Sequence, residues 1–276
     1  MLEKRIITVA LTGAMSPKAN NPEVPVTPEE IAEDAYKCYQ AGAAIVHLHM
    51  RDEYDQPSND LNKFEETIYL IKRKCNIICQ PTSTGKLFED YDVRLNYISK
   101  LNPEMCSYDP GSLNWMSGNP PYIMAFPPSY LSKLNKILLD QNIKPEIEIF
   151  DTGMIGIAEH YAEHGELKPP FHFQFVLGVK GGMAATVENL VILKNKLPEG
   201  STWSAFGISK WNLPIMYATI ALGGNVRVGL EDCSFYSKEV RASNEMLVSR
   251  AARVIREFNC EPATPDEARQ ILSINK

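Results

Sequence analysis

The stretch AAIVHLHMRDE, residues 43–53, decides the fold, because it combines a strand pattern with basic side chains on one face. Alternate side chains of a strand point to opposite faces. The apolar face consists of Val46, Leu48 and Met50, and the basic face of His47, His49 and Arg51. Central strands of an open parallel sheet are apolar on both faces, whereas a barrel strand can carry polar chemistry inward near its C-terminal end. The stretch therefore favours a barrel strand that ends at a functional site.

Short strand-like runs and longer helical runs alternate along the rest of the chain. The predicted strands are residues 5–12, 44–50, 76–82, 104–108, 144–150, 170–177, 201–207 and 225–230. The predicted helices are residues 27–42, 61–74, 89–100, 128–142, 152–165, 186–196, 209–222 and 237–258. Eight strands, each followed by a helix, predict an α/β fold, a closed (β/α)8 TIM barrel. We expect residues 1–276 to form a single domain with a C-terminal helical extension. A doubly wound open sheet is the alternative.

The first helix has the clearest end signals. Thr27 is placed to cap it, Pro28 to occupy its first turn, and Glu30 to complete a capping box. Gly42 follows its last turn, where glycine commonly ends a helix.

Three other predicted strands repeat the alternation of apolar and polar faces. In residues 171–175 three phenylalanines alternate with His172 and Gln174, and in residues 146–149 isoleucines alternate with Glu146 and Glu148. In residues 226–231 Val226, Val228 and Leu230 alternate with Arg227, Gly229 and Glu231. This pattern also favours the barrel over the open sheet.

The composition excludes several classes of protein. The net charge is −6 and no Lys/Arg cluster occurs, which argues against a nucleic-acid partner. The six cysteines form no CxxC pair, which indicates free thiols in a reducing compartment. No apolar run approaches the roughly 18 residues that a membrane span needs, and the first 15 residues resemble a strand more than a signal peptide. We therefore predict a cytoplasmic enzyme of small molecules.

His47 and His49 predict a metal site, because two residues apart on a strand their rings project to the same side. Imidazole nitrogens bind zinc at about 2.0–2.1 Å, and a catalytic site adds further ligands and keeps one position open. The alternative is two hydrogen-bonded histidines inside a polar barrel.

The stretch GGNVRVGLEDCSFY, residues 223–236, offers the partners that such a site needs. Arg227 and Glu231 share the inward face, and Asp232 follows at the end of the strand. The eighth strand of a closed barrel lies beside the first and two strands from the second, so Glu231 can reach a metal held by His47 and His49. The alternative is an acidic helix start. It explains Arg227 less well, because an inward guanidinium needs a carboxylate.

Three loops at predicted strand ends are candidates for substrate binding. QPTSTGK, residues 80–86, offers hydroxyls and backbone amides to a carboxylate, and residues 105–115 offer Ser107 and Asp109. Gly178, Gly181 and Gly182 would let the backbone approach a phosphate or a pantetheine arm. Ordinary loops and tight turns are the alternatives.

Five segments in this order resemble the β-keto acid cleavage enzyme family over essentially the whole chain. They are TGAMSPKANNPEVPVTPEEIA (12–32), AGAAIVHLHMRDE (41–53), PEMCSYDPGSLNW (103–115), FQFVLGVKGGM (173–183) and VRVGLEDCSFY (226–236). The resemblance implies a zinc-bearing (β/α)8 barrel that condenses a β-keto acid with acetyl-CoA and releases acetoacetate and a new acyl-CoA. It also implies a homo-oligomer, a homotetramer in most members.

The resemblance also implies roles for individual residues. His47, His49 and Glu231 match metal ligands, and Arg227 and Asp232 match an arginine–aspartate pair that provides the catalytic base. Ser83 and Gly85 fall in the loop that holds the substrate carboxylate. Ser107 matches a substrate-binding position where the aminohexanoate-cleaving enzyme has threonine, so a hydroxyl is kept there.

Met15 departs from the family members that cleave 3-keto-5-aminohexanoate, which have a glutamate there for the substrate ammonium. A thioether carries no charge, and an unpaired buried ammonium is costly. We therefore expect a β-keto acid with an uncharged side chain. Two alternatives remain: a metal-dependent aldolase or lyase that acts without CoA, and a protein that only binds metal.

Overall fold

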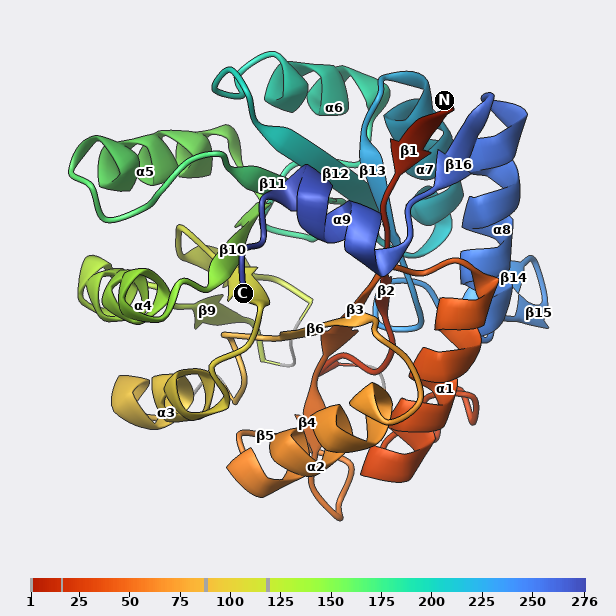
Figure 1. Cartoon of the computed structure of the whole chain (residues 1–276), viewed down its shortest axis with the longest axis horizontal. Helices are drawn as coiled ribbons and strands as arrows, with labels where there is room; N and C mark the ends of the chain where they lie inside the picture. Colours follow the sequence, from red (N-terminus) through yellow and green to blue (C-terminus); the bar gives the residue numbers. More distant parts are fainter. Residues whose placement is uncertain (1, 16, 87–88, 118–119) are drawn as a thin grey trace.

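A computed structural model describes residues 2–15, 17–86, 89–117 and 120–276. Its centre is an eight-stranded parallel sheet, nearly closed into a barrel and ringed by helices (Figure 1). The strand order is β6-β3-β2-β13-β12-β11-β10-β7, and the end strands β6 and β7 also lie side by side. The strands are β2 (Ile7–Ala10), β3 (Ile45–Leu48), β6 (Ile78–Pro81), β7 (Met105–Tyr108), β10 (Lys144–Ile149), β11 (His172–Leu177), β12 (Thr202–Gly207) and β13 (Asn225–Val228). All eight coincide with predicted strands, and the predicted TIM barrel is confirmed.

The helices lie between these strands in the predicted order. They are α1 (Pro28–Ala41), α2 (Leu61–Lys72), α3 (Tyr91–Leu101), α4 (Pro128–Gln141), α5 (Thr152–Glu163), α6 (Val187–Lys194), α7 (Asn212–Ala221) and α8 (Asn244–Glu257). A short 3₁₀ helix, η1 (Ser209–Trp211), precedes α7. Within the part of the chain that is described, no helix is both long and apolar enough to cross a bilayer.

The predicted helix 237–258 begins too early. Residues 235–241 instead form a hairpin of β14 (Phe235–Ser237) and β15 (Val240–Arg241), with Glu239 at a positive φ of 68°. Helix α8 starts only after Ser243, whose hydroxyl accepts a hydrogen bond from the Met246 amide. A strong N-cap and the turn before it therefore outweigh the helical pattern of the residues upstream.

The predicted ends of α1 are confirmed. The Thr27 hydroxyl accepts a hydrogen bond from the Glu30 amide, and the Glu30 carboxylate accepts one from the Thr27 amide, which is the capping box. Gly42 ends the helix with φ 116°, in the left-handed region where a side chain would be strained.

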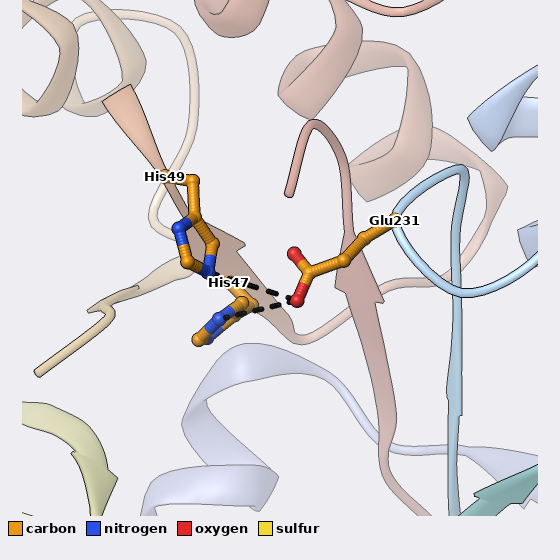
Figure 2. Close-up of side chains that lie close together, drawn as sticks. All are labelled: His47, His49 and Glu231. Atoms are coloured by element: carbon orange, nitrogen blue, oxygen red, sulfur yellow. Dashed lines mark ion pairs between the residues drawn. The ribbon is translucent and has the colours of Figure 1, made fainter. Parts of the chain in front are cut away.

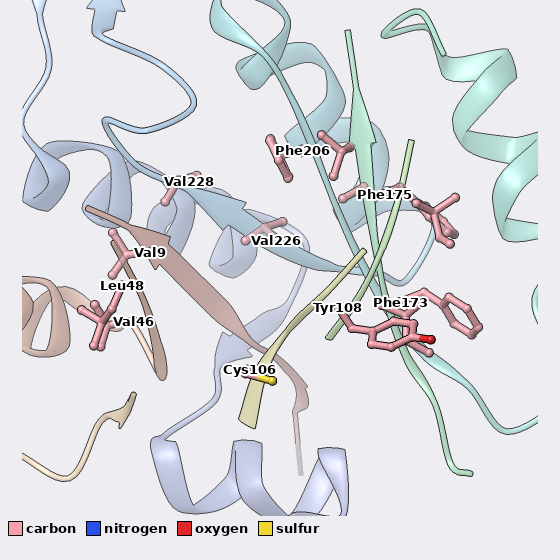
Figure 3. Packing of buried hydrophobic residues seen from close by; sticks show 14 of the residues in the cluster. Val9, Val46, Leu48, Cys106, Tyr108, Phe173, Phe175, Phe206, Val226 and Val228 are labelled. Carbon is pink, nitrogen blue, oxygen red and sulfur yellow. The ribbon is translucent and has the colours of Figure 1, made fainter. Parts of the chain in front are cut away.

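The two faces of each strand separate as the alternation predicts. Val46, Phe173 and Val226 belong to one buried cluster (Figure 3), together with helix residues such as Ile31 of α1 and Phe64 of α2. Polar side chains of the intervening positions, among them His47, Glu146, Gln174 and Arg227, are buried on the other face. The sheet is therefore apolar toward the helices and polar inside the barrel.

The N-terminal end of the barrel is closed by the end of the chain. β1 (Glu3–Arg5) pairs with β16 (Cys260–Pro262), and α9 (Pro265–Leu272) follows across the barrel end (Figure 1). Ala268 and Leu272 form a separate core with residues at or just before the starts of the strands, namely Ile6, Ala44, Ile45, Ile78 and Met105. The C-terminal ends of the strands are consequently left for function, as in other barrels.

The apolar cluster of α9 with the strand starts forms a plug at the N-terminal end of the barrel. We expect Leu272→Ala to lower the free energy of unfolding by about 2–5 kcal/mol, since Leu272 is 1% exposed within this plug. Urea denaturation measures the change. Leu213→Ala is the control, because Leu213 is 38% exposed on α7 and its truncation should cost about 0.5 kcal/mol or less. Equal losses in the two variants would contradict the role assigned to α9.

Candidate metal centre and active site

His47 and His49 converge on Glu231 at the C-terminal end of β3 (Figure 2). His47 lies in β3 and His49 directly follows it, with ring centroids 5.1 Å apart. Nε2 of His47 lies 3.8 Å from Glu231 Oε1, and Nε2 of His49 lies 3.7 Å from the same oxygen. All three ligand atoms lie within 4.8 Å of one another. The structure therefore brings together the three residues that the sequence predicts to share a cation.

Glu231 reaches this position because β13 lies beside β2, which lies beside β3. The Glu231 amide donates to the Ala10 carbonyl at 3.2 Å, which ties the end of β13 to β2. Gly13, with φ 65°, has no room for a side chain, since a Cβ there would lie 2.5 Å from Glu231 Cγ. Asn244 donates to the Leu11 carbonyl and accepts from the Leu230 amide, so it joins the same two strand ends from α8.

The charge states of the three side chains suit metal binding. Nδ1 of His47 lies 2.8 Å from the side-chain amide oxygen Oε1 of Gln80. With Nδ1 as the donor of this hydrogen bond, Nε2 keeps its lone pair for a metal. Burial lowers the pKa of His47, and it lowers that of His49 to about 4. Burial opposes ionisation of Glu231, but Arg227 and the two histidines hold its pKa at about 2.

The donor set fits a divalent cation such as zinc. Two neutral imidazoles and one carboxylate are ligands that catalytic zinc sites use. Oε2 of Glu231 is buried and has no hydrogen-bond partner among the described residues. A cation beside that oxygen would remove the cost of leaving it unsatisfied.

Arg227 is the centre of a network of buried charges beside these ligands. Its Nε and Nη2 donate to the two carboxylate oxygens of Asp232 at 2.9 and 3.0 Å, and Nη2 also donates to Glu231 at 2.7 Å. The guanidinium carbon lies 4.5 Å from the ring centre of Phe206. Burial raises the pKa of Asp232 to about 6, against the opposing effect of Arg227. The predicted arginine–aspartate pair is thus present, with Asp232 5% exposed.

Glu148 is a third acidic partner of Arg227, which the sequence analysis did not assign to the site. Its Oε1 lies 3.3 Å from Arg227 Nη1. Burial and the nearby Asp109 raise the pKa of Glu148 well above its usual value. The alternation of glutamate and isoleucine in residues 146–149 was the signal that placed Glu148 inside the barrel. The pairing with Arg227 joins β10 to β13, which no local pattern shows.

Ser83, in the expected carboxylate loop, and Ser107, at the end of β7, lie together. The Ser83 amide donates to the Ser107 hydroxyl at 3.0 Å, and the buried Ser83 hydroxyl has no partner among the residues described. The Thr84 hydroxyl donates to Asp109 at 2.8 Å. Gly85 has φ 54°, and a Cβ there would lie 1.9 Å from Asn59 Oδ1, so glycine is needed for close packing. The loop thus keeps one buried hydroxyl free for a ligand.

Met15 follows Gly13 by two residues and is 53% exposed. The Tyr122 hydroxyl donates to its sulfur at 3.9 Å. Tyr122 belongs to a hairpin of β8 (Leu113–Trp115) and β9 (Tyr122–Met124), in which it stacks on Trp115 with ring centroids 6.5 Å apart. Met15 therefore has an aromatic hydroxyl as a neighbour.

The glycines after β11 serve packing. A Cβ on Gly181 would lie 1.8 Å from the Asn114 carbonyl oxygen, and one on Gly182 would lie 2.9 Å from the Phe150 carbonyl oxygen. The Met116 amide donates to the Lys180 carbonyl, which joins the same loop to the β8–β9 hairpin. Close contact with this hairpin at Gly181, and with the end of β10 at Gly182, requires the two glycines.

Arg51 shares the inward face with the two histidines, as predicted, but contacts the β2 loop. It is 2% exposed, and its guanidinium donates to the carbonyls of Thr12 and Gly13 and to the Asp55 carboxylate. Arg51 thus fixes the backbone that lies against Glu231.

The fold and the site together define a (β/α)8 barrel with a candidate metal centre beside a buried acid–arginine network. The family model of the beta-keto acid cleavage enzymes matches residues 4–274. The chain is 42% identical to the 3-keto-5-aminohexanoate cleavage enzyme of Fusobacterium nucleatum subsp. nucleatum, with 100% of both chains covered. It is 34% identical to the 3-oxoadipate:acetyl-CoA acetyltransferase of Cupriavidus necator, with 99% of this chain and 96% of the relative covered.

A solved structure supports the fold independently. The apo structure of ObcA superimposes with a TM-score of 0.82 at 18% identity, over 94% of this chain and 67% of that one. The chain belongs to the β-keto acid cleavage enzyme family. It is an enzyme that breaks a carbon–carbon bond and transfers an acyl group.

We expect His47→Ala, His49→Ala and Glu231→Gln each to lower the affinity for Zn²⁺ at least about 100-fold, since even the outer partners of metal ligands are worth about 10–100-fold. Metal per chain after gel filtration, and the Zn²⁺-induced rise in Tm, measure the loss. His160→Ala, which removes an exposed histidine of α5, is the control and should retain the metal. Full metal content in Glu231→Gln would contradict the three-ligand site.

Proposed function

We propose that the protein is a zinc-dependent β-keto acid cleavage enzyme that uses acetyl-CoA and releases acetoacetate and a new acyl-CoA. The observation that carries the proposal is the convergence of His47, His49 and Glu231 beside the Arg227–Asp232 pair. Family membership and the acetyl-CoA in the name of the Cupriavidus relative support it.

Bound zinc would supply a Lewis acid that polarises the ketone of the substrate. His47, His49 and Glu231 would hold it, and the burial of both histidines would limit the access of water to the substrate oxygens. Glu231 links the metal ligands to the Arg227–Asp232 pair, because one of its oxygens lies near the histidines and also accepts a hydrogen bond from Arg227.

Asp232 would take a proton from C2 of the β-keto acid. Arg227 holds both carboxylate oxygens and so fixes the orientation of this base. The C2 carbanion then attacks the thioester carbon of acetyl-CoA, and the CoA thiolate leaves. The thiolate adds to the original ketone at C3, the C2–C3 bond breaks, and the proton from Asp232 returns to C2 of acetoacetate.

The carboxylate of the substrate would lie on Ser83, Gly85 and Ser107. The unpartnered hydroxyl of Ser83 supports this assignment, because a buried donor without a partner is costly until a ligand accepts from it. The side chain of the substrate would lie toward Met15. The thioether and the neighbouring Tyr122 offer no counter-charge to an ammonium, so we propose an uncharged substrate side chain.

The oligomeric state and the cellular location of the protein are also part of the proposal. We propose a cytoplasmic homotetramer in which residues 1–276 form one domain. The six cysteines are free thiols, which suits a reducing compartment. The tetramer rests on the family resemblance.

Asp232→Asn should lower kcat about 10²–10⁴-fold, because an amide cannot accept the C2 proton. Acetoacetate release and deuterium exchange at C2, followed by NMR in D₂O, measure the two effects. The metal content should not change. Glu245→Gln, which neutralises an exposed acid of α8, is the control. Exchange at the wild-type rate in Asp232→Asn would show that another group is the base.

A panel of β-keto acids tests the proposed function. With acetyl-CoA, kcat/KM should be higher for 3-oxohexanoate than for 3-keto-5-aminohexanoate. Met15→Glu should shift this ratio toward the amino compound about 10–100-fold, the worth of one charge-assisted hydrogen bond. Met116→Glu is the matched control, since Met116 is 52% exposed against 53% for Met15.

Two outcomes of this panel would contradict the proposal. Turnover without acetyl-CoA would show a metal-dependent aldolase or lyase instead of an acyltransferase that needs CoA. A wild-type preference for the amino compound would contradict the uncharged side chain and leave the reaction itself standing.

A further inference from the structure

The loop of residues 82–85, at the C-terminal end of β6, is held from outside the barrel at three consecutive carbonyls. The Tyr97 hydroxyl donates to the Thr82 carbonyl. The Tyr130 hydroxyl donates to the Ser83 carbonyl at 2.7 Å, and Arg94 Nε donates to the Thr84 carbonyl at 3.1 Å. Arg94 and Tyr97 lie on α3 and Tyr130 lies on α4, so two helices hold one turn of chain.

These three contacts fix the direction of the loop amides. In a planar trans peptide the C=O and the following N–H point in opposite directions. Carbonyls that point toward α3 and α4 therefore turn the amides of Ser83, Thr84 and Gly85 away from those helices. The Ser83 amide confirms this direction, because it donates to Ser107 of the neighbouring strand β7. The Thr84 amide donates to the Thr82 hydroxyl at 3.1 Å, so the Ser83 and Thr84 amides both have partners within the protein. The three contacts thus fix the backbone that carries the buried Ser83 hydroxyl, which has no partner among the described residues.

Arg94 adds a positive charge behind the same loop. Its side chain is fully buried, with its guanidinium carbon 4.5 Å from the Tyr130 ring centre and 5.2 Å from that of Phe126. Its Nη2 is buried without a hydrogen-bond partner among the residues described. Asp109 is the nearby acid, and it accepts from the Thr84 hydroxyl. Carbonyl groups and ring faces therefore stabilise this guanidinium in place of a paired carboxylate.

Both phenols remain donors at any working pH. Burial raises the pKa of Tyr97 and that of Tyr130, so neither hydroxyl loses its proton near neutrality. Each hydroxyl can therefore be deleted as one hydrogen bond, with the buried ring left in place.

We propose that Arg94, Tyr97 and Tyr130 are positioning residues that turn the loop of residues 82–85 so that it binds a carboxylate. The ligand class is a β-keto acid, and its identity as substrate rests on the proposed function. The residues act through the loop backbone and do not touch the ligand. A merely structural role would stabilise the barrel without favouring an anion.

Binding of acetoacetate and of uncharged methyl acetoacetate, measured by calorimetry, separates the two roles. We expect Tyr130→Phe and Tyr97→Phe each to raise the Kd for acetoacetate about fivefold, the worth of one hydrogen bond, and the double variant about 20-fold. The Kd for the methyl ester should not change. Arg94→Lys keeps the charge and loses the guanidinium fork. This variant should also weaken the binding of acetoacetate and leave the binding of the methyl ester unchanged.

Tyr91→Phe is the matched control. The Tyr91 ring lies 5.7 Å from the Arg94 guanidinium carbon, and its hydroxyl has no hydrogen bond to the described part of the loop. This variant should bind both ligands as the wild type does. In steady-state assays, Tyr130→Phe should raise KM for the β-keto acid about fivefold and leave KM for acetyl-CoA unchanged.

The outcomes keep this proposal and the proposed function apart. Wild-type protein that releases no acetoacetate, while Tyr130→Phe still weakens acetoacetate binding selectively, would refute the function and support the positioning role. Equal weakening of the acid and the ester, or no difference from Tyr91→Phe, would overturn the positioning role whatever the activity. Failure of the wild type to bind acetoacetate would also overturn it.

Discussion

The buried guanidinium of Arg227 is the constraint on which the rest of the site depends. A charge inside a barrel needs acidic partners, and Asp232, Glu231 and Glu148 contact it from the end of β13 and from β10. Removal of one partner from such a buried set typically costs about 3–5 kcal/mol. The same network therefore fixes Glu231 against the two histidines and holds Asp232 in a defined orientation, so the candidate metal centre and the candidate base share one electrostatic support.

The ends of the barrel divide stability from chemistry. Helix α9 and the β1–β16 pair close the N-terminal end with an apolar plug, so the polar interior opens only where the strands end. At that end, the strand ends and the loops after them carry the candidate site residues. Substitutions in the plug consequently act on unfolding, and substitutions in the loops act on binding. The barrel interior contains buried polar atoms without hydrogen-bond partners among the described residues, which lower stability. The apolar plug at the other end offsets this loss.

The sequence alone predicted the eight strands and the meeting of His47, His49 and Glu231. Alternation within a strand is a local signal, and the order of strands in a closed barrel is a general rule, so both were readable. The pairing of Glu148 with Arg227 and the close contacts of Gly181 with the β8–β9 hairpin and of Gly182 with Phe150 were not predicted. Each depends on residues that meet only after the chain has folded, and a single sequence carries no local signal for such contacts. The late start of α8 did have a local signal, because Ser243 is a typical N-cap residue, but the predicted helix began upstream of it.

Recognition of the two ends of a substrate would fall to different parts of the barrel mouth. Residues 82–85 follow β6 and are held by α3 and α4, whereas Met15 lies in the loop after β2. Arg51 clamps the carbonyls of Thr12 and Gly13 in that second loop, and Gly13 lies against Glu231. A change at Met15 can therefore alter which side chain is accepted while the carboxylate loop stays fixed. Since the Met15 loop also packs on a candidate metal ligand, larger changes there would disturb the metal centre, which limits how freely specificity can vary.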